Sequence, residues 1–224
     1  MQLLSAPLRV DEWGLPGGVL DEEDPVRTSV FDEDEDDALH LAPPADDSMA
    51  AEDRAARQAD EARAADARAT GRVVSYGSEF RLFGWPAAGL EGPTASTQLT
   101  VHRTPAGATE AVRRHGARAL DIPGGTTFAV PGVPGAIGVR TNGESAADLD
   151  WEYDPTFEWF VYFPHGATEA RVRMAMTLPV APAVNPGQRA RAREAAVPLR
   201  NVAQAAVVAV SQRYAAHLDD VLGD

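Results

Sequence analysis

The first third of the chain carries almost all of its net charge. Residues 1–70 hold 19 acidic and 6 basic residues, a local net charge of −13, whereas the whole 224-residue chain has a net charge of −14. Like charges at this density repel one another and resist compaction. The sequence therefore predicts that the hydrophobic core is built from residues 71–224 and that the preceding segment is an arm.

The arm divides into two parts. Residues 1–46 mix turn signals with short apolar pieces and contain six consecutive acids at 32–37, so we predict an acidic, irregular segment. In the alternative interpretation, apolar pieces that include Trp13 and Leu15 strap onto the body or a partner. Residues 47–70 are good helix formers without a large apolar stripe, which predicts a solvated connector helix or, as the alternative, a helix that docks late, rather than a core element.

The remainder, 71–224, reads as a single α+β domain: a mainly antiparallel sheet with one or two packed helices and a C-terminal amphipathic helix. Thr104 followed by Pro105 predicts a helix start, with the helix running to about Ala119. The last helix is predicted over 186–222 with a break at Pro198. Strands are predicted at 72–83, 97–102, 126–130, 136–141 and 157–163.

One ten-residue pattern occurs twice. The pattern Pro-x-Gly-Ala-Thr-Glu-Ala-x-x-Arg stands at 105–114, inside a predicted helix, and again at 164–173. Apolar residues alternate with arginines from 170 to 178, which favours the second arm of a hairpin. The helical first copy leaves a helix at 164–176 as the alternative.

Composition excludes several classes of function. The chain has no cysteine, so disulfides, thiolate zinc sites, iron–sulfur clusters and cysteine nucleophiles are ruled out. An isoelectric point near 4.7 disfavours nucleic acid as a partner, because phosphate binding needs a basic surface. No stretch approaches 18 uninterrupted apolar residues, so we predict no transmembrane segment. The start of the sequence lacks the features of a secretory signal, which indicates either a cytoplasmic protein or a mature form without its export signal.

The densest group of polar and aromatic side chains lies between 148 and 163. Seven of the 15 aromatic residues fall within 151–163, and four acids that alternate with neighbouring residues share one face of an extended chain. The group is compatible with cation binding, glycosidase-like acid and base chemistry, partner recognition, or a loop that keeps an aromatic strand soluble. An EF-hand is excluded, because Tyr153 replaces the loop glycine and Trp159 the final glutamate. The candidate binding residues are Trp151, Tyr153, Asp148, Asp150, Glu152 and Asp154.

No catalytic residue, metal ligand or cofactor is predicted. The sequence lacks nucleophile-elbow, P-loop, dinucleotide-binding and paired-histidine zinc motifs. His102 and His165 each stand beside a strand end, which would allow them to approach one another. Isolated histidines are more often structural groups.

The order of elements in 72–222 resembles a known class of domain. It consists of a strand, the helix capped at Thr104-Pro105, the turn at 130–136 leading into a strand, an aromatic strand, and a C-terminal helix that includes Gln212 to Leu218. This order is similar to that of the small α+β ligand- or partner-binding domains of actinobacterial envelope lipoproteins and sensor proteins. The resemblance implies no catalytic residues, and this chain lacks the cysteine that would carry a lipid anchor.

Together these features favour a non-enzymatic binding or interaction protein of the bacterial envelope or exterior. We expect a protein partner, with a carbohydrate or other envelope ligand as the second choice. The alternative is a cytoplasmic adaptor whose acidic arm binds a basic partner. A carbohydrate-active enzyme that uses the carboxylates near 148–158 comes third.

Overall fold

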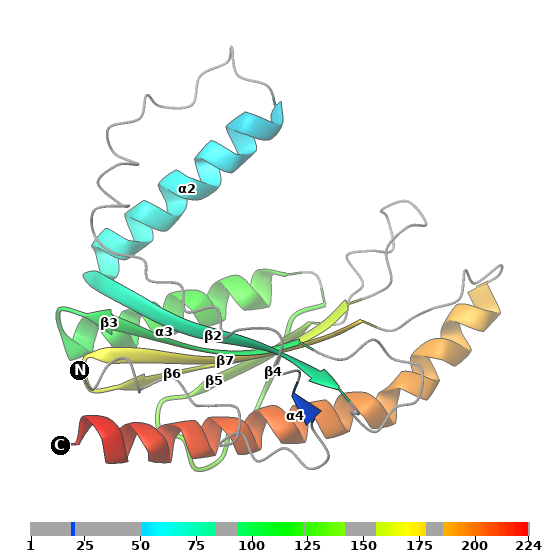
Figure 1. Ribbon diagram of the computed structural model, residues 1–224. Coiled ribbons are helices and arrows are strands. Elements are labelled where there is room, and N and C mark those ends of the chain that lie inside the picture. The colour runs from blue at the N-terminus through cyan, green and yellow to red at the C-terminus, as the bar shows by residue number, and fades with distance from the viewer. Residues whose placement is uncertain are drawn as a thin grey trace.

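The computed structural model describes residues 19–20, 51–83, 94–122, 124–141, 156–177 and 186–223. Its centre is one seven-stranded antiparallel sheet in the order β1-β2-β3-β7-β6-β5-β4. One face of the sheet carries α3, and α4 runs along the other (Figure 1). The predicted α+β class with a mainly antiparallel sheet and a C-terminal helix is therefore confirmed.

The elements follow one another along the chain as follows: β1 (Val19–Leu20), α2 (Ala51–Thr70), β2 (Arg72–Phe83), β3 (Thr94–His102), α3 (Pro105–Asp121), β4 (Thr126–Phe128), β5 (Ile137–Thr141), β6 (Thr156–His165), β7 (Thr168–Thr177) and α4 (Pro186–Leu222). Within the described part of the chain, no helix combines the length and apolar character needed to cross a membrane.

The second copy of the ten-residue pattern forms a hairpin. β6 and β7 pair in register from Thr156 opposite Thr177 to His165 opposite Thr168. Gly166, in the connecting turn, has a φ of +54°, a conformation that glycine adopts without steric cost. The predicted hairpin is confirmed, and the helical alternative for 164–176 is wrong.

The α4 face of the sheet is apolar. Alternate residues of β6, namely Phe157, Trp159, Val161 and Phe163, belong to the same buried cluster as Val207, Val210, Tyr214 and Leu218 of α4. The three- and four-residue spacing in α4 places its residues on one side of the helix. The rings of Phe163 and Tyr214 meet edge to face at 5.9 Å. This face provides the main hydrophobic core.

The predicted break at Pro198 is wrong. α4 is a continuous 37-residue helix that includes this proline. Proline removes one intrahelical hydrogen bond and tends to kink a helix, yet it does not oblige the helix to end. The amino-terminal part of α4 runs past the end of the sheet (Figure 1).

α3 begins as the sequence predicts. The Thr104 hydroxyl accepts a hydrogen bond from the Gly107 amide at 3.0 Å, and Pro105 occupies the first helical position. The last residue of α2 lies directly against this turn. A Cβ atom at Gly107 would stand 2.1 Å from the Thr70 carbonyl oxygen, so the two helices approach this closely only because residue 107 is glycine.

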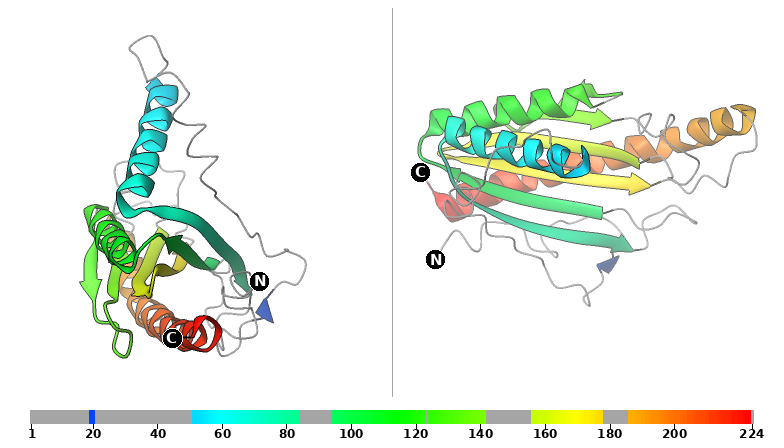
Figure 2. Two further views of the ribbon diagram at one scale, coloured as in Figure 1. Left: turned by 90° about the vertical axis from the view of Figure 1, so that its left-hand side faces the viewer. Right: turned by 90° about the horizontal axis from the view of Figure 1, so that it is seen from above.

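α2 is only partly solvated. Its amino-terminal part stands away from the sheet (Figure 2), whereas Ala64, Ala67 and Thr70 are buried. These last two turns pack against α3 and β2. The expectation of a solvated connector helix thus differs from the structure at the carboxyl end, where small side chains allow close packing without a stripe of large apolar residues.

Candidate functional site

The six candidate binding residues of the sequence analysis lie outside the described residues, so their role stays a prediction. These are Trp151, Tyr153, Asp148, Asp150, Glu152 and Asp154. The segment that contains them joins β6 at Thr156. That end of β6 is about 30 Å from His165 at the other end, since a strand rises about 3.3 Å per residue.

Within the described part, charged side chains gather between the sheet and the helices α2 and α3. We call this group the ionic cluster; it consists of Asp66, His102, Arg114, His115, Arg118 and Glu169. Glu169, near the start of β7, is 2% exposed, and Asp66 on α2 is 7% exposed. Charges are buried at this level only when they are paired.

His115 bridges the two buried carboxylates. Its Nδ1 lies 2.5 Å from the Glu169 Oε1 atom, and its Nε2 lies 3.3 Å from the Asp66 Oδ2 atom. Because both ring nitrogens face carboxylate oxygens, both act as donors, which requires the protonated imidazolium. α3 is thereby connected to β7 on one side and to α2 on the other.

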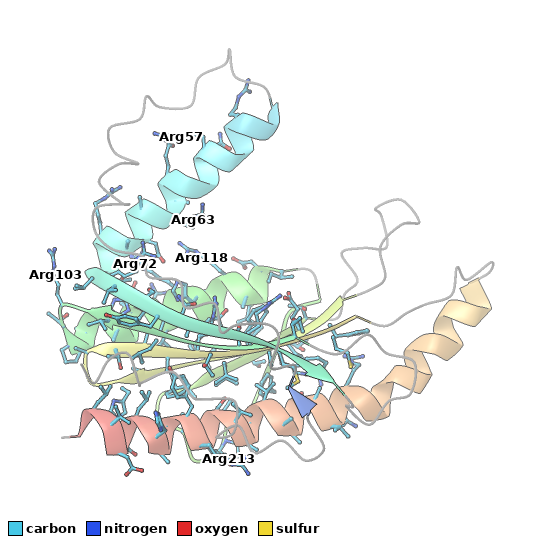
Figure 3. The ribbon with its side chains drawn as sticks, in the orientation of Figure 1. Arg57, Arg63, Arg72, Arg103, Arg118 and Arg213 are labelled. Carbon is cyan, nitrogen blue, oxygen red and sulfur yellow. The ribbon has the colours of Figure 1, made fainter. Side chains whose placement is uncertain are left out.

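The Asp66 carboxylate also forms an ion pair with the guanidinium group of Arg118. Two nitrogen–oxygen distances of 3.1 Å make this pair bidentate, and Arg118 extends from α3 toward α2 (Figure 3). Arg114 adds a third contact, at 3.4 Å. The carboxyl-terminal end of α2 is thus held by three cationic side chains of α3.

His102 completes the cluster from the end of β3. Its Nδ1 lies 3.1 Å from the Thr70 carbonyl oxygen, which can only accept, so Nδ1 carries the hydrogen. The Nε2 atom faces the Glu169 Oε2 atom at 3.6 Å, longer than a hydrogen bond. His102 therefore joins the last backbone carbonyl of α2 to the sheet.

The electrostatics of the cluster keep its central groups charged. Burial disfavours the charged form of His115, but the hydrogen bonds and charges of Asp66 and Glu169 prevail and raise its pKa to about 9. Burial also opposes ionisation of Glu169, yet its contacts with His102 and His115 hold the pKa of that carboxyl below its usual value. The pKa of Asp66 is lowered in the same way, chiefly by His115 and Arg118 acting against burial.

This arrangement suits an ion-pair network better than acid–base chemistry. A general acid or base works best with a pKa near the working pH, whereas the pKa values of His115, Glu169 and Asp66 all shift away from neutrality. The ring nitrogens of His115 also point to different carboxylates. Among the described residues, no group of three or more histidine and acidic side chains is arranged to hold a metal ion.

A second feature is a hollow of about 620 Å³ on the α4 side of the molecule. We call it the turn-side hollow. Its walls come from the turn at 132–134, the β6–β7 turn and the last turns of α4, and they are formed by Gly132, Val133, Pro134, Phe163, Pro164, His165, Gly166, Ala167, Thr168, Gln212, Ala215, Ala216, Asp219, Leu222 and Gly223. Its volume lies within the range of small-molecule sites, roughly 300–1,000 Å³.

Hydrogen bonds fix the polar side chains of the hollow. The His165 Nε2 atom lies 2.9 Å from the Asp219 Oδ1 atom. Gln212 donates from Nε2 to the Pro131 carbonyl oxygen at 2.7 Å, which ties α4 to the neighbouring turn. Thr168 donates its hydroxyl hydrogen to the His165 carbonyl oxygen at 2.6 Å. The polar side chains of the hollow are therefore held in fixed positions.

The two histidines that the sequence placed beside strand ends do not meet. His102 belongs to the ionic cluster, and His165 pairs with Asp219 of α4. Sequence reasoning missed Asp66, His115 and Glu169 as a group because they lie far apart along the chain. Asp66 on α2 is 49 positions before His115 on α3, and Glu169 on β7 is more than 50 positions after His115. The one available signal was a glutamate on a strand whose next two alternate positions, Arg171 and Arg173, carry arginines.

Comparisons with known proteins place the chain in no family. No family model matches, and no curated protein matches its sequence. Among solved structures, it is similar to the extracellular domain of PknH from Mycobacterium tuberculosis, with a TM-score of 0.40 and 13% identity over 88% of this chain and 93% of that domain. The neighbour is a mycobacterial extracellular domain, but a likeness at this level carries no conclusion about fold or function.

Proposed function

We propose that this protein is a non-enzymatic binding protein of the bacterial envelope or exterior. The observation that carries the proposal is the turn-side hollow: a concave surface of about 620 Å³ built from two turns and the end of a long helix. Ligand sites are concave surfaces of this size that combine apolar walls with a few placed polar groups. Pro134 and Leu222 supply accessible apolar surface, and His165 and Asp219 supply polar side chains at the edge.

The ionic cluster supports a binding role over an enzymatic one. The charged groups of Asp66, His115 and Glu169 are paired with one another across α2, α3 and β7, and their pKa values shift away from the neutral range in which acid–base catalysts operate. Its contacts hold α2 against the body. We therefore assign it a structural role and the hollow the role of recognition.

The aromatic and acidic residues at 148–154 remain part of the proposal as a second recognition surface. They join the sheet at the end of β6 that lies opposite the hollow. The two surfaces are accordingly tested separately.

The test is to block the hollow without disturbing the fold. Ala216 lines the hollow and is exposed, so Ala216→Trp adds a large ring there without entering the core. The matched control is Ala205→Trp, at an exposed position of α4 outside the hollow. Amide spectra of the full chain would be recorded with a trimer of N-acetylglucosamine, which is neutral, and with its partly de-acetylated form, which carries ammonium groups.

We expect amide shifts at 132–134, 166–168 and 212–223 with one of these probes. The shifts should disappear in Ala216→Trp and persist in Ala205→Trp. Binding that survives Ala216→Trp and is lost in Trp151→Ala and Tyr153→Ala would move recognition to the other surface. Turnover of the sugar trimer, or the absence of binding at both surfaces, would contradict the proposal.

A further inference from the structure

The electrostatics of the turn-side hollow favour one class of ligand. Asp219 is the one carboxylate among the lining residues, and none of them is an arginine. The Asp219 side chain is 73% exposed, so its charge is available to a molecule that enters from solvent. The only basic side chain of the lining is His165, which already lies against this carboxylate.

The end of α4 adds negative potential at the same place. α4 ends at Leu222, and Leu222 and Gly223 both line the hollow. Backbone carbonyls of the last helical turn give a helix C-terminus a partial negative charge, which favours cations nearby. The Gly223 amide donates to the Asp219 carbonyl at 3.2 Å, so the last turn of the helix lies directly beside the hollow.

Apolar side chains stand beside this negative end. Pro134, Pro164 and Leu222 provide accessible apolar surface in the hollow, whereas Val133 and Phe163 lie buried behind it. A molecule that fits both features has a positively charged head for Asp219 and an aliphatic body for the wall. Anions are disfavoured, because they would face the carboxylate and the helix end together.

We propose that the turn-side hollow binds an alkylammonium group, with Asp219 as its counter-ion and His165 as the group that it displaces. This inference rests on the proposed binding function and names the ligand chemistry of the same site. The ammonium group occurs both in free aliphatic amines and in a lysine side chain, and the two sources share the same recognition. His165 contacts one carboxylate oxygen of Asp219 in the unliganded protein and turns away when the cation enters.

The first experiment compares probes of equal length and different charge. Pentylamine, 1-pentanol and valerate would be titrated into the full chain at low salt, and amide shifts would be followed at Gly132, Gly166 and Gly223. We expect pentylamine to bind about five times more tightly than pentanol, since one exposed ion pair contributes up to ~1 kcal/mol. Valerate should bind most weakly, and the preference for pentylamine should shrink at 0.5 M salt.

The second experiment uses two variants with opposite expected effects. Asp219→Asn keeps the shape of the side chain, removes its charge and should abolish the preference of pentylamine over pentanol. His165→Gln removes the competing imidazole and should tighten pentylamine binding about two- to threefold. Asp220→Asn is the matched control, because this neighbouring acid is exposed and does not line the hollow. It should leave the preference unchanged.

Capped lysine, with both backbone ends blocked, separates the two sources. Binding of pentylamine alone assigns a free amine, and equal binding of capped lysine assigns a side chain as the natural ligand; either result supports the ammonium site. Valerate binding at the hollow as tightly as pentylamine would overturn the inference while leaving the binding function intact. Pentylamine shifts that are absent from the hollow, or unchanged in Asp219→Asn, would also overturn it.

Discussion

Both faces of the sheet bury apolar side chains, but only the face toward α2 and α3 adds the ionic cluster. Toward α4, β6 and β7 present Trp159, Val161 and Val172, and burial of apolar surface provides the free energy. Toward α2 and α3, Phe160 and Tyr162 of the same hairpin form a smaller apolar cluster with α3 and β5, and Glu169 adds a buried group of paired charges. Apolar contact is non-directional, whereas an ion pair requires a particular partner at a particular place. The difference indicates that apolar packing stabilises both faces and that the charges of one face determine where α2 docks.

The largest expected effect is on the apolar face. Trp159 is 1% exposed, and Trp159→Ala removes a large buried side chain that the surrounding residues cannot replace. We expect a loss of about 3–5 kcal/mol in the free energy of unfolding, measured by urea denaturation followed by circular dichroism. Val202→Ala on the exposed side of α4 should change it by less than about 0.5 kcal/mol. A loss below about 1.5 kcal/mol for Trp159→Ala would contradict the assignment of the main core.

A smaller effect is expected from neutralising the centre of the ionic cluster. Glu169→Gln preserves shape but leaves the protonated His115 without its closest counter-charge, at a cost of about 2–3 kcal/mol. The matched control is Glu110→Gln, at the equivalent position of the other ten-residue copy. Glu110 pairs with Arg113 and Arg114 on the surface of α3, where solvent screens the interaction.

Equal losses in the free energy of unfolding for these two substitutions would show that burial does not strengthen the ion pairs of the cluster. The same urea denaturation would decide the matter. Protease cleavage provides a second readout, because loss of the cluster should expose the backbone near Thr70 in Glu169→Gln but not in Glu110→Gln.

The smallest effect is a pH dependence confined to the ionic face. The pKa of His115 rises from 6.5 to about 9 on folding, so its contribution to stability is complete below pH 6.5 and is lost as the pH rises through 9. The lowered pKa values of Asp66 and Glu169 have the opposite sign, and their contribution is lost as the pH falls through the acidic range. We expect Tm to fall by a few degrees between pH 6.5 and 9.5.

His115→Gln should remove most of this alkaline fall. The measurement is thermal unfolding of both proteins across the pH range, with the difference in Tm between them as the readout. If that difference does not vary with pH, His115 does not titrate with a raised pKa.

The fold was largely predictable because its signals are local. Alternating apolar residues and the aromatic run at 157–163 predicted strands, and Thr104 with Pro105 predicted the start of α3. Pro198 shows the limit of such rules, since proline favours the end of a helix and α4 nevertheless continues through this residue.

The two copies of the ten-residue pattern mark this limit more sharply. Glu110 lies on an exposed helix surface, whereas Glu169 is buried in a hairpin. The same local sequence thus adopts two structures, and packing partners elsewhere in the chain decide between them. The ionic cluster was not predictable for the same reason: its members are brought together by the sheet and by helix packing, and no spacing along the sequence marks them.

The glycine at 107 has a consequence for how substitutions would be tolerated at the α2–α3 contact. The carbonyl oxygen of Thr70, the last residue of α2, occupies the space where a methyl group at position 107 would lie. Backbone atoms cannot rotate aside as a flexible side chain can. Alanine would suit the helix itself better than glycine does. Selection for a more stable α3 and selection for a docked α2 are therefore opposed at a single position. A protein with alanine at position 107 would keep the domain but lose the contact between α2 and α3.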